Sequence, residues 1–455
     1  MSKLLLTYYG DDFTGSTDVL EALTLAGVRT VLFLTPPTPD LLHERFADLQ
    51  AFGIAGMSRS WTPAQMDQRL PPIYAQLRAT GAPLIHYKVC STFDSSPSIG
   101  SIGRALDLGA TACDTPLVPL LVGAPPLRRY TLFGNLFATV GSETYRLDRH
   151  PTMAHHPVTP MGESDLRRHL AQQTQKPSAL FDILHLGGSD GEVDQRFAQL
   201  REQGAAVVLF DVLEESHLAT IGRLIWQMRG DQPLFVVGSS GVEYALTAYW
   251  RASGRLPPLT PPAPAAAPDK IIVVSGSCSP ETEQQIRRAA ATGFAVIALD
   301  TPRLVDPATA DAAADAAIRL AASALAAGRS VVLHTSLGPH DPQIAATRAQ
   351  LAMLGLPSEQ MADFIGTQLG RILAAVVRQY GVRRVVVAGG DTSGHVTSTL
   401  GIYALDMLTP IAPGSPLCRG YAADPAIDGI EIALKGGQVG KVDYFAHVRQ
   451  GSNSR

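Results

Sequence analysis

Two adjacent carboxylates, Asp11 and Asp12, follow a short apolar run near the start of the chain, in the stretch YYGDDFTGSTD. Aspartate oxygens can bind sugar hydroxyls, position a metal ion, or accept the proton of an attacking hydroxyl group. A simpler role also exists, because aspartate is a favoured cap at the N-terminus of a helix. A cap explains one aspartate but explains two less well. We therefore expect this pair to contact a ligand.

A second group of polar side chains lies in YKVCSTFDSSP, where Lys88 ends an apolar run and hydroxyl groups and Asp94 follow. A cation, hydroxyls and a carboxylate in one turn suit a polyhydroxy acid, although Lys88 could equally be a surface lysine on an edge strand. Arg59 ends another apolar run and could clamp a carboxylate through two hydrogen bonds, or could be solvated. Cys90 is expected to be inert, since no histidine is placed by the sequence to activate it.

Turns rich in glycine and hydroxyl groups, SGSCSPET and GGDTSG, follow apolar runs in the second half of the chain. Free backbone N–H groups and the positive end of a helix make such turns anion sites, but each could also be an ordinary capped turn. Neither turn is a Walker A loop or a G-x-G-x-x-G fingerprint, which disfavours a P-loop NTPase and an ordinary dinucleotide-binding enzyme. LKGGQVG either lets the backbone approach a ligand closely or forms a hairpin.

Short apolar runs recur along the chain and predict the strands that position these groups. In the first half they are KLLLTYY, TVLFL, FGIAGM, PLIHYKV and AVVLFDV, with helical spacing between them, for example at residues 17–26. In the second half, helices expected at 308–327 and 361–380 alternate with the apolar runs KIIVVSG, AVIALD, SVVLHTS and RRVVVAGG. This alternation predicts an α/β fold class, with two α/β domains and mostly parallel sheets.

The proline- and alanine-rich stretch LPPLTPPAPAAAP marks the predicted domain boundary. Such a composition favours an extended, semi-rigid linker. We therefore expect an N-terminal domain at 1–255, a linker at 256–268 and a C-terminal domain at 269–455. Ligands of open α/β sheets bind at the carboxyl ends of the strands, so we expect a ligand cleft between the two domains.

Composition excludes several functional classes. The chain has 455 residues and a formal net charge of -4, and no run of Lys or Arg suggests nucleic-acid binding. Its 4 cysteines lie far apart and predict no disulfide framework or zinc cluster. Adjacent histidines in MAHHPVTPM have poor spacing for metal ligation, so no metal site is predicted. No long apolar run predicts a membrane span or a signal peptide, and we expect a cytoplasmic protein, with a homodimer as the base-rate expectation.

Several motifs, taken together and in order, resemble those of the four-carbon acid sugar kinase family, long catalogued as a domain of unknown function. They are DDFTGSTD, YKVCSTFDSSP, HHPVTPM, VVGSSG, VSGSCS, VAGGDTSG and LKGGQVG. The resemblance covers nearly the whole chain. It implies an acid-sugar-binding domain followed by a nucleotide-binding domain, and phosphorylation of four-carbon sugar acids by ATP. The CSTFDS motif is most similar to the 3-oxo-tetronate kinase branch.

The resemblance also implies roles for individual residues. Substrate contacts are implied for Asp11, Asp12, Thr14, Arg59, Lys88, Ser91 and Asp94. Nucleotide contacts are implied for Ser275, Gly276, Ser277, Gly389, Gly390, Asp391, Thr392, Ser393, Gly394, Gly436 and Gly437.

Two segments depart from the pattern of the 3-oxo-tetronate branch. SIGSIG, residues 98–103, stands where Gly-Asn-Ile-Gly is usual and has serine in place of the asparagine. GAPPLRRY, residues 123–130, lacks the usual Asn-Gly-Arg. These departures leave the exact acid open among 3-oxo-tetronate, threonate and erythronate types.

The predicted reaction is ATP-dependent phosphorylation of a terminal hydroxyl of a four-carbon sugar acid. Phosphoryl transfer depends on positioning and charge neutralisation, so Mg²⁺ is expected as well, held mostly by the nucleotide and water. Asp12 is the preferred catalytic base, and Asp391 is the rival base or a magnesium partner. Local positive charge would come from Lys88, Arg59 and Lys435. The alternative is a sugar-acid or nucleotide sensor that uses the same two-domain cleft without transferring phosphate.

Overall fold

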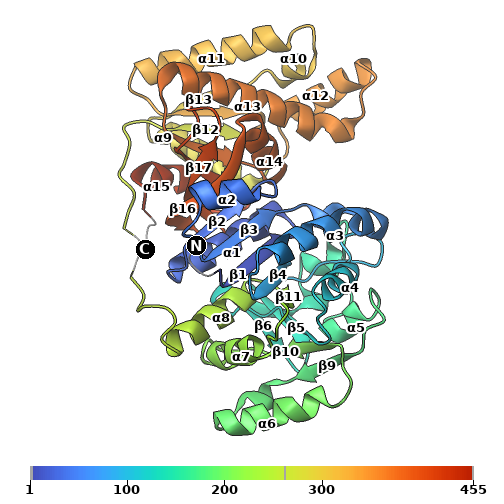
Figure 1. Ribbon diagram of the computed structural model, residues 1–455. Helices are drawn as coiled ribbons and strands as arrows, with labels where there is room; N and C mark the ends of the chain where they lie inside the picture. Colours follow the sequence, from blue (N-terminus) through green and yellow to red (C-terminus); the bar gives the residue numbers. More distant parts are fainter. Residues whose placement is uncertain (1–3, 261–262, 453–455) are drawn as a thin grey trace. The chain divides into compact units, whose positions relative to one another are not determined.

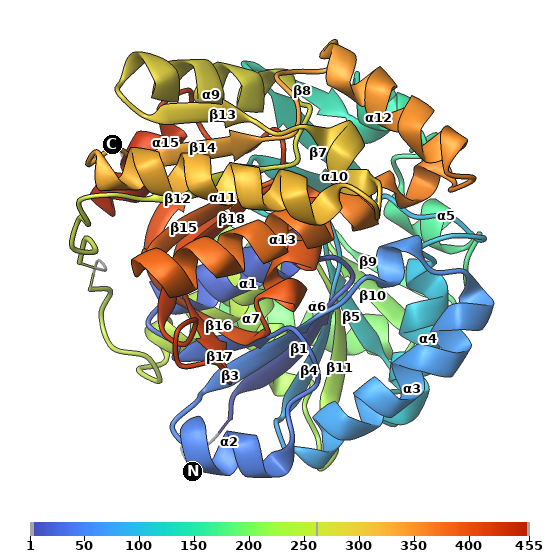
Figure 2. The same cartoon turned by 90° about the horizontal axis from the view of Figure 1, so that it is seen from above.

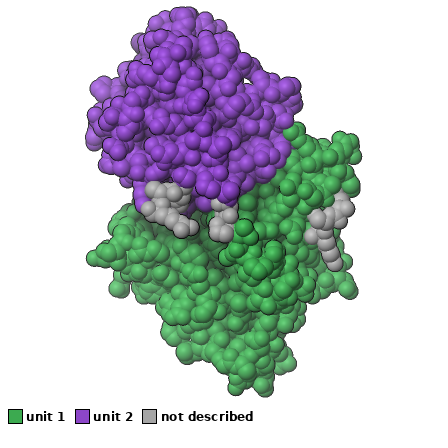
Figure 3. All heavy atoms as spheres, turned by 90° about the vertical axis from the view of Figure 1, so that its left-hand side faces the viewer, with its two compact units in different colours: residues 1–260 green, residues 261–455 purple. Residues whose placement is uncertain are grey.

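The computed structural model describes residues 4–260 and 263–452 (Figure 1). It divides into two compact units, Met1–Thr260 and Pro261–Arg455, which Figure 3 colours separately. Both units are α/β, so the predicted fold class of two α/β domains is confirmed. Residues 261 and 262 of the predicted linker lie outside the described residues, and the exact limits of the linker stay a prediction.

Unit 1 is built on a parallel sheet whose strand order is β2-β3-β1-β4-β11-β5-β10-β9. All the pairings between these strands are parallel, as the runs of apolar residues predict. The strands are β1 (Leu6–Gly10), β2 (Thr30–Phe33), β3 (Ala51–Ala55), β4 (Leu84–Lys88), β5 (Val118–Leu121), β9 (Ser178–Phe181), β10 (Val207–Phe210) and β11 (Leu234–Gly238).

Helices cover both faces of this sheet. α1 packs against β1, β2 and β3 and contacts α8, which packs against β11. α3 and α4 contact each other and β4. The helix expected at residues 17–26 begins earlier, because Asp12 caps it and the first turn starts at once. The helices are α1 (Phe13–Leu25), α2 (Pro39–Arg45), α3 (Pro63–Ala79), α4 (Ile102–Ala112), α5 (Leu166–Leu170), α6 (Asp190–Arg201), α7 (Ser216–Gln227) and α8 (Gly241–Ala252).

A small antiparallel sheet in unit 1 was not expected from the sequence. Its order is β6-β7-β8, with strands Arg129–Leu132, Asn135–Val140 and Glu143–Arg146. Its strands have only 4, 6 and 4 residues and include many half-buried positions, so they give only a weak strand signal.

Unit 2 has a mixed sheet in the order β13-β14-β12-β15-β18-β17-β16. The strands from β13 to β18 in this order are parallel, whereas β17 runs antiparallel to both of its neighbours β18 and β16. The strands are β12 (Ile272–Ser275), β13 (Ala295–Ala298), β14 (Val331–His334), β15 (Arg384–Ala388), β16 (Ile402–Ala412), β17 (Ser415–Ala422) and β18 (Ile430–Lys435).

The helices of unit 2 also lie on both faces of its sheet. α11 and α13 lie side by side on one face, and α9 and α15 contact each other (Figures 1 and 2). The two helices predicted here are confirmed, one at the predicted residues and one slightly shorter. The helices are α9 (Pro280–Ala291), α10 (Thr301–Val305), α11 (Ala310–Ala326), α12 (Pro342–Met353), α13 (Met361–Tyr380), α14 (Gly390–Thr399) and α15 (Tyr444–Gln450). No helix of residues 4–260 or 263–452 is long and apolar enough to cross a bilayer.

A fully buried arginine holds several parts of unit 2 together. Arg384, the first residue of β15, donates to Glu431 at 2.6 Å and to the carbonyls of Val448 and Ala266 at 3.0 and 2.6 Å. These contacts tie the central strand to α15 and to the segment that enters the unit. Glu431 is 31% exposed and stays partly solvated without Arg384, but the backbone carbonyls would lose their donors. A buried acceptor left without a donor costs more than the hydrogen bond itself contributes.

We therefore expect Arg384→Met to lower the free energy of unfolding of unit 2 by about 3 kcal/mol, measured by urea denaturation. Arg378→Met is the matched control, since Arg378 forms a similar pair with Asp424 at 2.8 Å but is half exposed. The control should lose less than about 1 kcal/mol. Equal losses for the two variants would contradict this role of Arg384.

Candidate functional site

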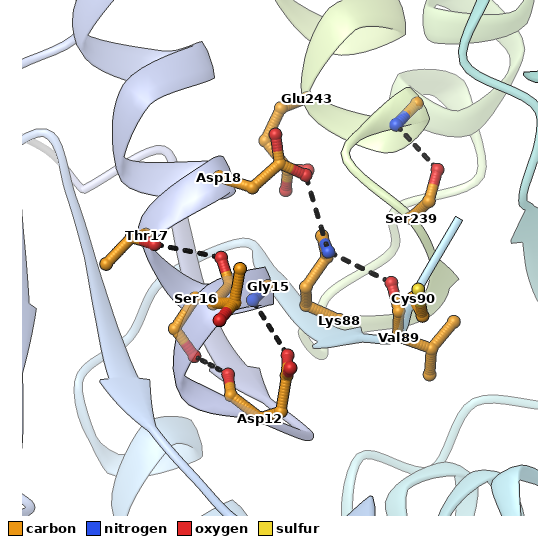
Figure 4. A network of polar contacts seen from close by, with 12 residues as sticks. Asp12, Gly15, Ser16, Thr17, Asp18, Lys88, Val89, Cys90, Ser239 and Glu243 are labelled. Carbon is orange, nitrogen blue, oxygen red and sulfur yellow. Dashed lines mark hydrogen bonds and ion pairs between the residues drawn. The ribbon is translucent and has the colours of Figure 1, made fainter. Parts of the chain in front are cut away.

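The turn between β1 and α1 uses both aspartates. Asp12 is the N-cap of α1, and its Oδ1 accepts a hydrogen bond from the Gly15 N–H at 2.7 Å (Figure 4). Asp11 is not part of the cap, and its side chain is buried. The cap role therefore applies to one aspartate and to only one of its two carboxylate oxygens.

Arg59 joins the two aspartates. It lies in the short 3-10 helix Ser58–Ser60 that follows β3, and its Nε and Nη2 donate to Asp11 at 3.2 and 2.8 Å. Its Nη1 lies 3.0 Å from Oδ2 of Asp12. Burial raises the pKa of Asp11 to about 6, although the Arg59 guanidinium opposes this shift. Because guanidinium has five N–H donors, Arg59 keeps donors for a ligand after these contacts.

Lys88 lies in the interior of unit 1 and not on its surface. It ends β4, which lies between β1 and β11, and it is 1% exposed. Its Nζ donates to the Val89 carbonyl at 3.0 Å and lies 3.5 Å from Oδ2 of Asp18 on α1 (Figure 4). Burial alone would lower the pKa of Lys88, but Asp18 and neighbouring acidic groups outweigh it and leave the pKa raised. The reading of Lys88 as a solvated lysine on an edge strand is therefore wrong.

The loop after Lys88 forms its own small network. Thr92 Oγ1 lies 2.6 Å from Oδ1 of Asp94 and 2.9 Å from the Cys90 sulfur. Burial raises the pKa of the Cys90 thiol, so the inert reading of this cysteine agrees with its surroundings. Burial also acts to raise the pKa of Asp94, but Arg59 and Thr92 outweigh it and lower the pKa.

The remaining predicted substrate residues belong to the same strand ends. Thr14 lies in the first turn of α1, where its carbonyl accepts from Thr17 Oγ1 at 2.9 Å. Ser91 lies directly after Cys90 and is partly exposed. Because β3, β1 and β4 are adjacent and parallel, their carboxyl ends bring the predicted substrate residues of unit 1 to one edge of the sheet.

A buried pair beneath Lys88 was missed in the sequence. His86 and Glu243 are fully buried, and His86 Nδ1 lies 2.6 Å from Glu243 Oε1 while its Nε2 lies 3.1 Å from the Gly238 carbonyl. His86 precedes Lys88 by two positions on β4, and Glu243 lies in the first turn of α8. Nothing in the sequence connects residues so far apart, and only the pairing of β4 with β11 brings them together.

Arg129 is a second residue that sequence reasoning missed. It begins β6 and pairs with Ala124, just beyond the carboxyl end of β5. Its Nη1 contacts only backbone carbonyls, at 3.1 to 3.3 Å, and its Nε is buried without a hydrogen-bond partner. Within residues 4–260 and 263–452, no carboxylate forms an ion pair with it. The available signal was its place in residues 123–130, where the chain departs from the family pattern.

Three loops of unit 2 converge at the carboxyl ends of β12, β15 and β18. A Cβ atom added to Gly276 would lie 2.3 Å from Thr392 Oγ1, and one added to Gly389 would lie 3.4 Å from the Ser277 N, so the first two loops touch. A Cβ atom on Gly437 would lie 2.9 Å from Ser277 Oγ, which places the third loop against the first. The nucleotide residues implied by the resemblance are thereby brought together.

The N-terminus of α14 is open in this cluster. Its N-cap is Gly389, with φ +128°, a backbone conformation that favours glycine, and no side chain caps the helix. The first N–H groups of the helix have no partners within the helix, so they can bind an anion. Asp391 lies exposed in this first turn. The loop LKGGQVG leads from β18 to α15, so the hairpin reading of this motif is wrong.

Comparisons with known proteins identify both units. A model of a sugar-binding N-terminal domain matches residues 6–246, and a model of a nucleotide-binding C-terminal domain matches residues 272–445. A 3-oxo-isoapionate kinase of Paraburkholderia graminis is 50% identical over 98% of this chain and 94% of its own length. A 3-oxo-tetronate kinase of Methylobacterium radiotolerans is 35% identical over 97% of this chain and 98% of its own length.

Two solved structures share the fold. One, from Salmonella typhimurium and described as a putative tRNA synthase, has a TM-score of 0.80 and 26% identity, covering 97% of this chain and 98% of the other. A Haemophilus influenzae protein from a domain family of unknown function has a TM-score of 0.76 and 25% identity, covering 97% and 99%. The two domain matches and the relatives together show that this chain belongs to the four-carbon acid sugar kinase family and is an ATP-dependent carbohydrate-acid kinase.

Proposed function

We propose that the chain transfers the γ-phosphoryl group of ATP to a terminal hydroxyl of a 3-oxo sugar acid, with 3-oxo-isoapionate as the first candidate. The observation that carries this proposal is the cluster of Arg59, Lys88 and two aspartates at one sheet edge of unit 1. The choice of acid is supported by the 50% identity to a 3-oxo-isoapionate kinase, against 35% to a 3-oxo-tetronate kinase.

Both departures from the 3-oxo-tetronate pattern adjoin the acid site, which supports a different acid. In the first departure Ser101 stands in place of asparagine and caps α4, accepting from the Arg104 N–H at 3.1 Å. Its neighbour Gly100 packs on Arg59: a Cβ atom there would lie 2.6 Å from the Arg59 carbonyl, and the Gly100 N–H donates to the Trp61 carbonyl at 2.9 Å. Arg129 belongs to the second departure; burial lowers its pKa, and Cys90, the neighbour of the predicted contact Ser91, opposes this shift. Changes in these segments therefore alter the surroundings of the predicted substrate contacts.

Asp12 is our candidate for the group that orients and deprotonates the attacking hydroxyl. Its carboxylate is held on one side by the helix N-terminus and on the other by Arg59, which fixes its direction. Its side chain is 27% exposed, whereas that of Asp11 is 4% exposed and engaged by two Arg59 contacts. Asp12 is therefore the more accessible of the two to a substrate hydroxyl, as a general base requires.

The donors of unit 2 fit a magnesium ion that arrives with the nucleotide. Asp391 offers an exposed carboxylate, and Ser277 and Thr392 offer hydroxyls beside the open end of α14. Within the described ranges 4–260 and 263–452, no group of three or more His, Cys, Asp or Glu residues could hold a metal ion. Mg²⁺ bound through one carboxylate, phosphates and water needs no such group. When bound, it would neutralise phosphate charge.

We also propose a cytoplasmic location, which agrees with the 4 cysteines of the chain all being free thiols. A homodimer stays a prediction. The sensor alternative is not favoured, because the relatives are named as kinases.

The direct test is ADP release from MgATP with 3-oxo-isoapionate, 3-oxo-tetronates, threonates and erythronates. We expect the highest kcat/KM with 3-oxo-isoapionate.

Asp12→Asn should lower kcat by at least roughly 100-fold, as loss of a general base does, with little change in the KM for ATP. Asp391→Asn should mainly raise the KM for MgATP. Turnover that survives in Asp12→Asn but not in Asp391→Asn would assign the base to Asp391, and no turnover with any acid would sink the kinase proposal.

Gly15 allows a test that removes no functional group. A Cβ atom there would lie 2.6 Å from Asp12 Oδ1 and 3.0 Å from Lys88 Nζ, so both groups must move. We expect Gly15→Ala to raise the KM for the acid by roughly tenfold or more, equivalent to about 1.4 kcal/mol, with the KM for ATP unchanged. Gly191→Ala, in the first turn of α6 with nothing within 4 Å, is the control and should leave both values unchanged. Equal effects on acid and ATP would contradict the assignment of the acid to this edge.

A further inference from the structure

Lys435 is a buried cation without a carboxylate partner. It ends β18, is 1% exposed, and its Nζ donates to Thr282 Oγ1 at 2.9 Å and to the Gly437 carbonyl at 3.2 Å. No acidic group forms an ion pair with it within the described ranges of the chain. A buried ammonium bound only to neutral oxygens is costly, which is unlike the paired Lys88 of unit 1.

The Gly437 carbonyl is the centre of this arrangement. Besides Lys435, it accepts hydrogen bonds from Ser279 Oγ at 2.5 Å and Thr282 Oγ1 at 2.8 Å, both at the start of α9. In a trans peptide the carbonyl and the following N–H point in opposite directions, and the described chain has no cis bonds. The N–H of exposed Gln438 therefore points away from these donors. Among the described residues no backbone group accepts a hydrogen bond from the Gln438 N–H, so it can donate to an anion.

The surroundings of Lys435 contain few charges. Glu281, in the first turn of α9, is the acidic group that acts on it. On the other side lies α15, whose Tyr444 ring centroid is 6.0 Å from Nζ and whose hydroxyl lies 2.7 Å from Ser415 Oγ. At this end of β18, the Gly389 N–H after β15 donates to the Lys435 carbonyl and Ser415 Oγ of β17 donates to the Leu434 carbonyl. Neither residue has a side chain that titrates near neutral pH. An incoming polyphosphate would be the strongest negative charge near Lys435.

We propose that Lys435 is a positioning residue for the nucleotide: its ammonium holds the Gly436–Gly437 turn in its phosphate-binding form and supplies the buried positive charge that the triphosphate of ATP requires. This inference rests on the proposed function of unit 2 in binding ATP. It adds that Lys435 lies behind the loop, hydrogen-bonded to the Gly437 carbonyl and shielded from solvent, and acts on the phosphates from that position.

Proton linkage follows from the burial of this group. Burial lowers the pKa of Lys435 to about 8, so the free protein loses this charge as the pH rises through 8. Bound phosphates favour the charged form and raise the pKa, so ATP binding at pH 8 should take up part of a proton. The contribution of Lys435 to ATP affinity should accordingly be nearly constant below pH 7 and weaken as the pH rises from 7 to 9.

The experiment is titration calorimetry with ATP at pH 8, in two buffers of different ionisation enthalpy. We expect wild type to take up roughly half a proton, and Lys435→Met to take up none and bind ATP roughly tenfold more weakly at pH 7. Lys435→Arg, which keeps the charge but does not titrate in this range, should restore much of the affinity without proton uptake. Lys441→Met, which removes an exposed lysine of the same loop, is the control and should behave as wild type.

The outcomes separate this inference from the proposed function. Undiminished proton uptake and affinity in Lys435→Met would overturn the role of Lys435 while leaving ATP binding intact. No ATP binding by wild type would instead contradict the proposed function. If Lys435→Met unfolds, as judged by circular dichroism, the pH profile of Lys435→Arg decides: a profile that still falls above pH 8 overturns the inference.

Discussion

The proposed acid site depends on one constraint: α1 begins immediately after β1 ends, and two aspartates fill the turn. Asp12 must cap the helix, and Asp11, which is buried, must be compensated, so Arg59 is drawn to both. Arg59 in turn is fixed by the loop that contains Gly100. The geometry of the site is therefore set by requirements of folding before any substrate arrives, which is the preorganisation that phosphoryl transfer uses.

The two units handle negative ligands in different ways. In unit 1 two cations are paired in advance, Arg59 with Asp11 and Asp12, and Lys88 with Asp18, whereas Arg129 contacts only backbone carbonyls among the described residues. In the proposed acid site, a ligand of Arg59 and Lys88 would meet cations that are already neutralised, so discrimination among sugar acids would depend on geometry and hydrogen bonds. In the described part of unit 2, the buried ammonium of Lys435 and the open end of α14 leave positive charge for an anion. That arrangement favours a ligand with a high negative charge, as expected for a nucleoside triphosphate.

Much of this could be predicted because the signals are local. An apolar run, a polar turn and a helical pattern follow one another in few residues, so Asp12 as a cap, the strand ahead of Lys88 and the helix Met361–Tyr380 are visible in the sequence. The glycine and hydroxyl turns of unit 2 are local as well. Their convergence follows from the rule that adjacent parallel strands present their carboxyl ends at one edge of the sheet.

The sequence by itself determined the element types, the two-domain α/β class and the family, since these depend on periodicity and on motifs in order. Only the tertiary structure decided which strands are neighbours, and therefore that Lys88 is interior, that His86 meets Glu243 and that Arg129 reaches the end of β5. The reason is physical: burial and charge compensation are pairwise properties of residues far apart in the chain. A single residue type in a sequence carries no information about its partner.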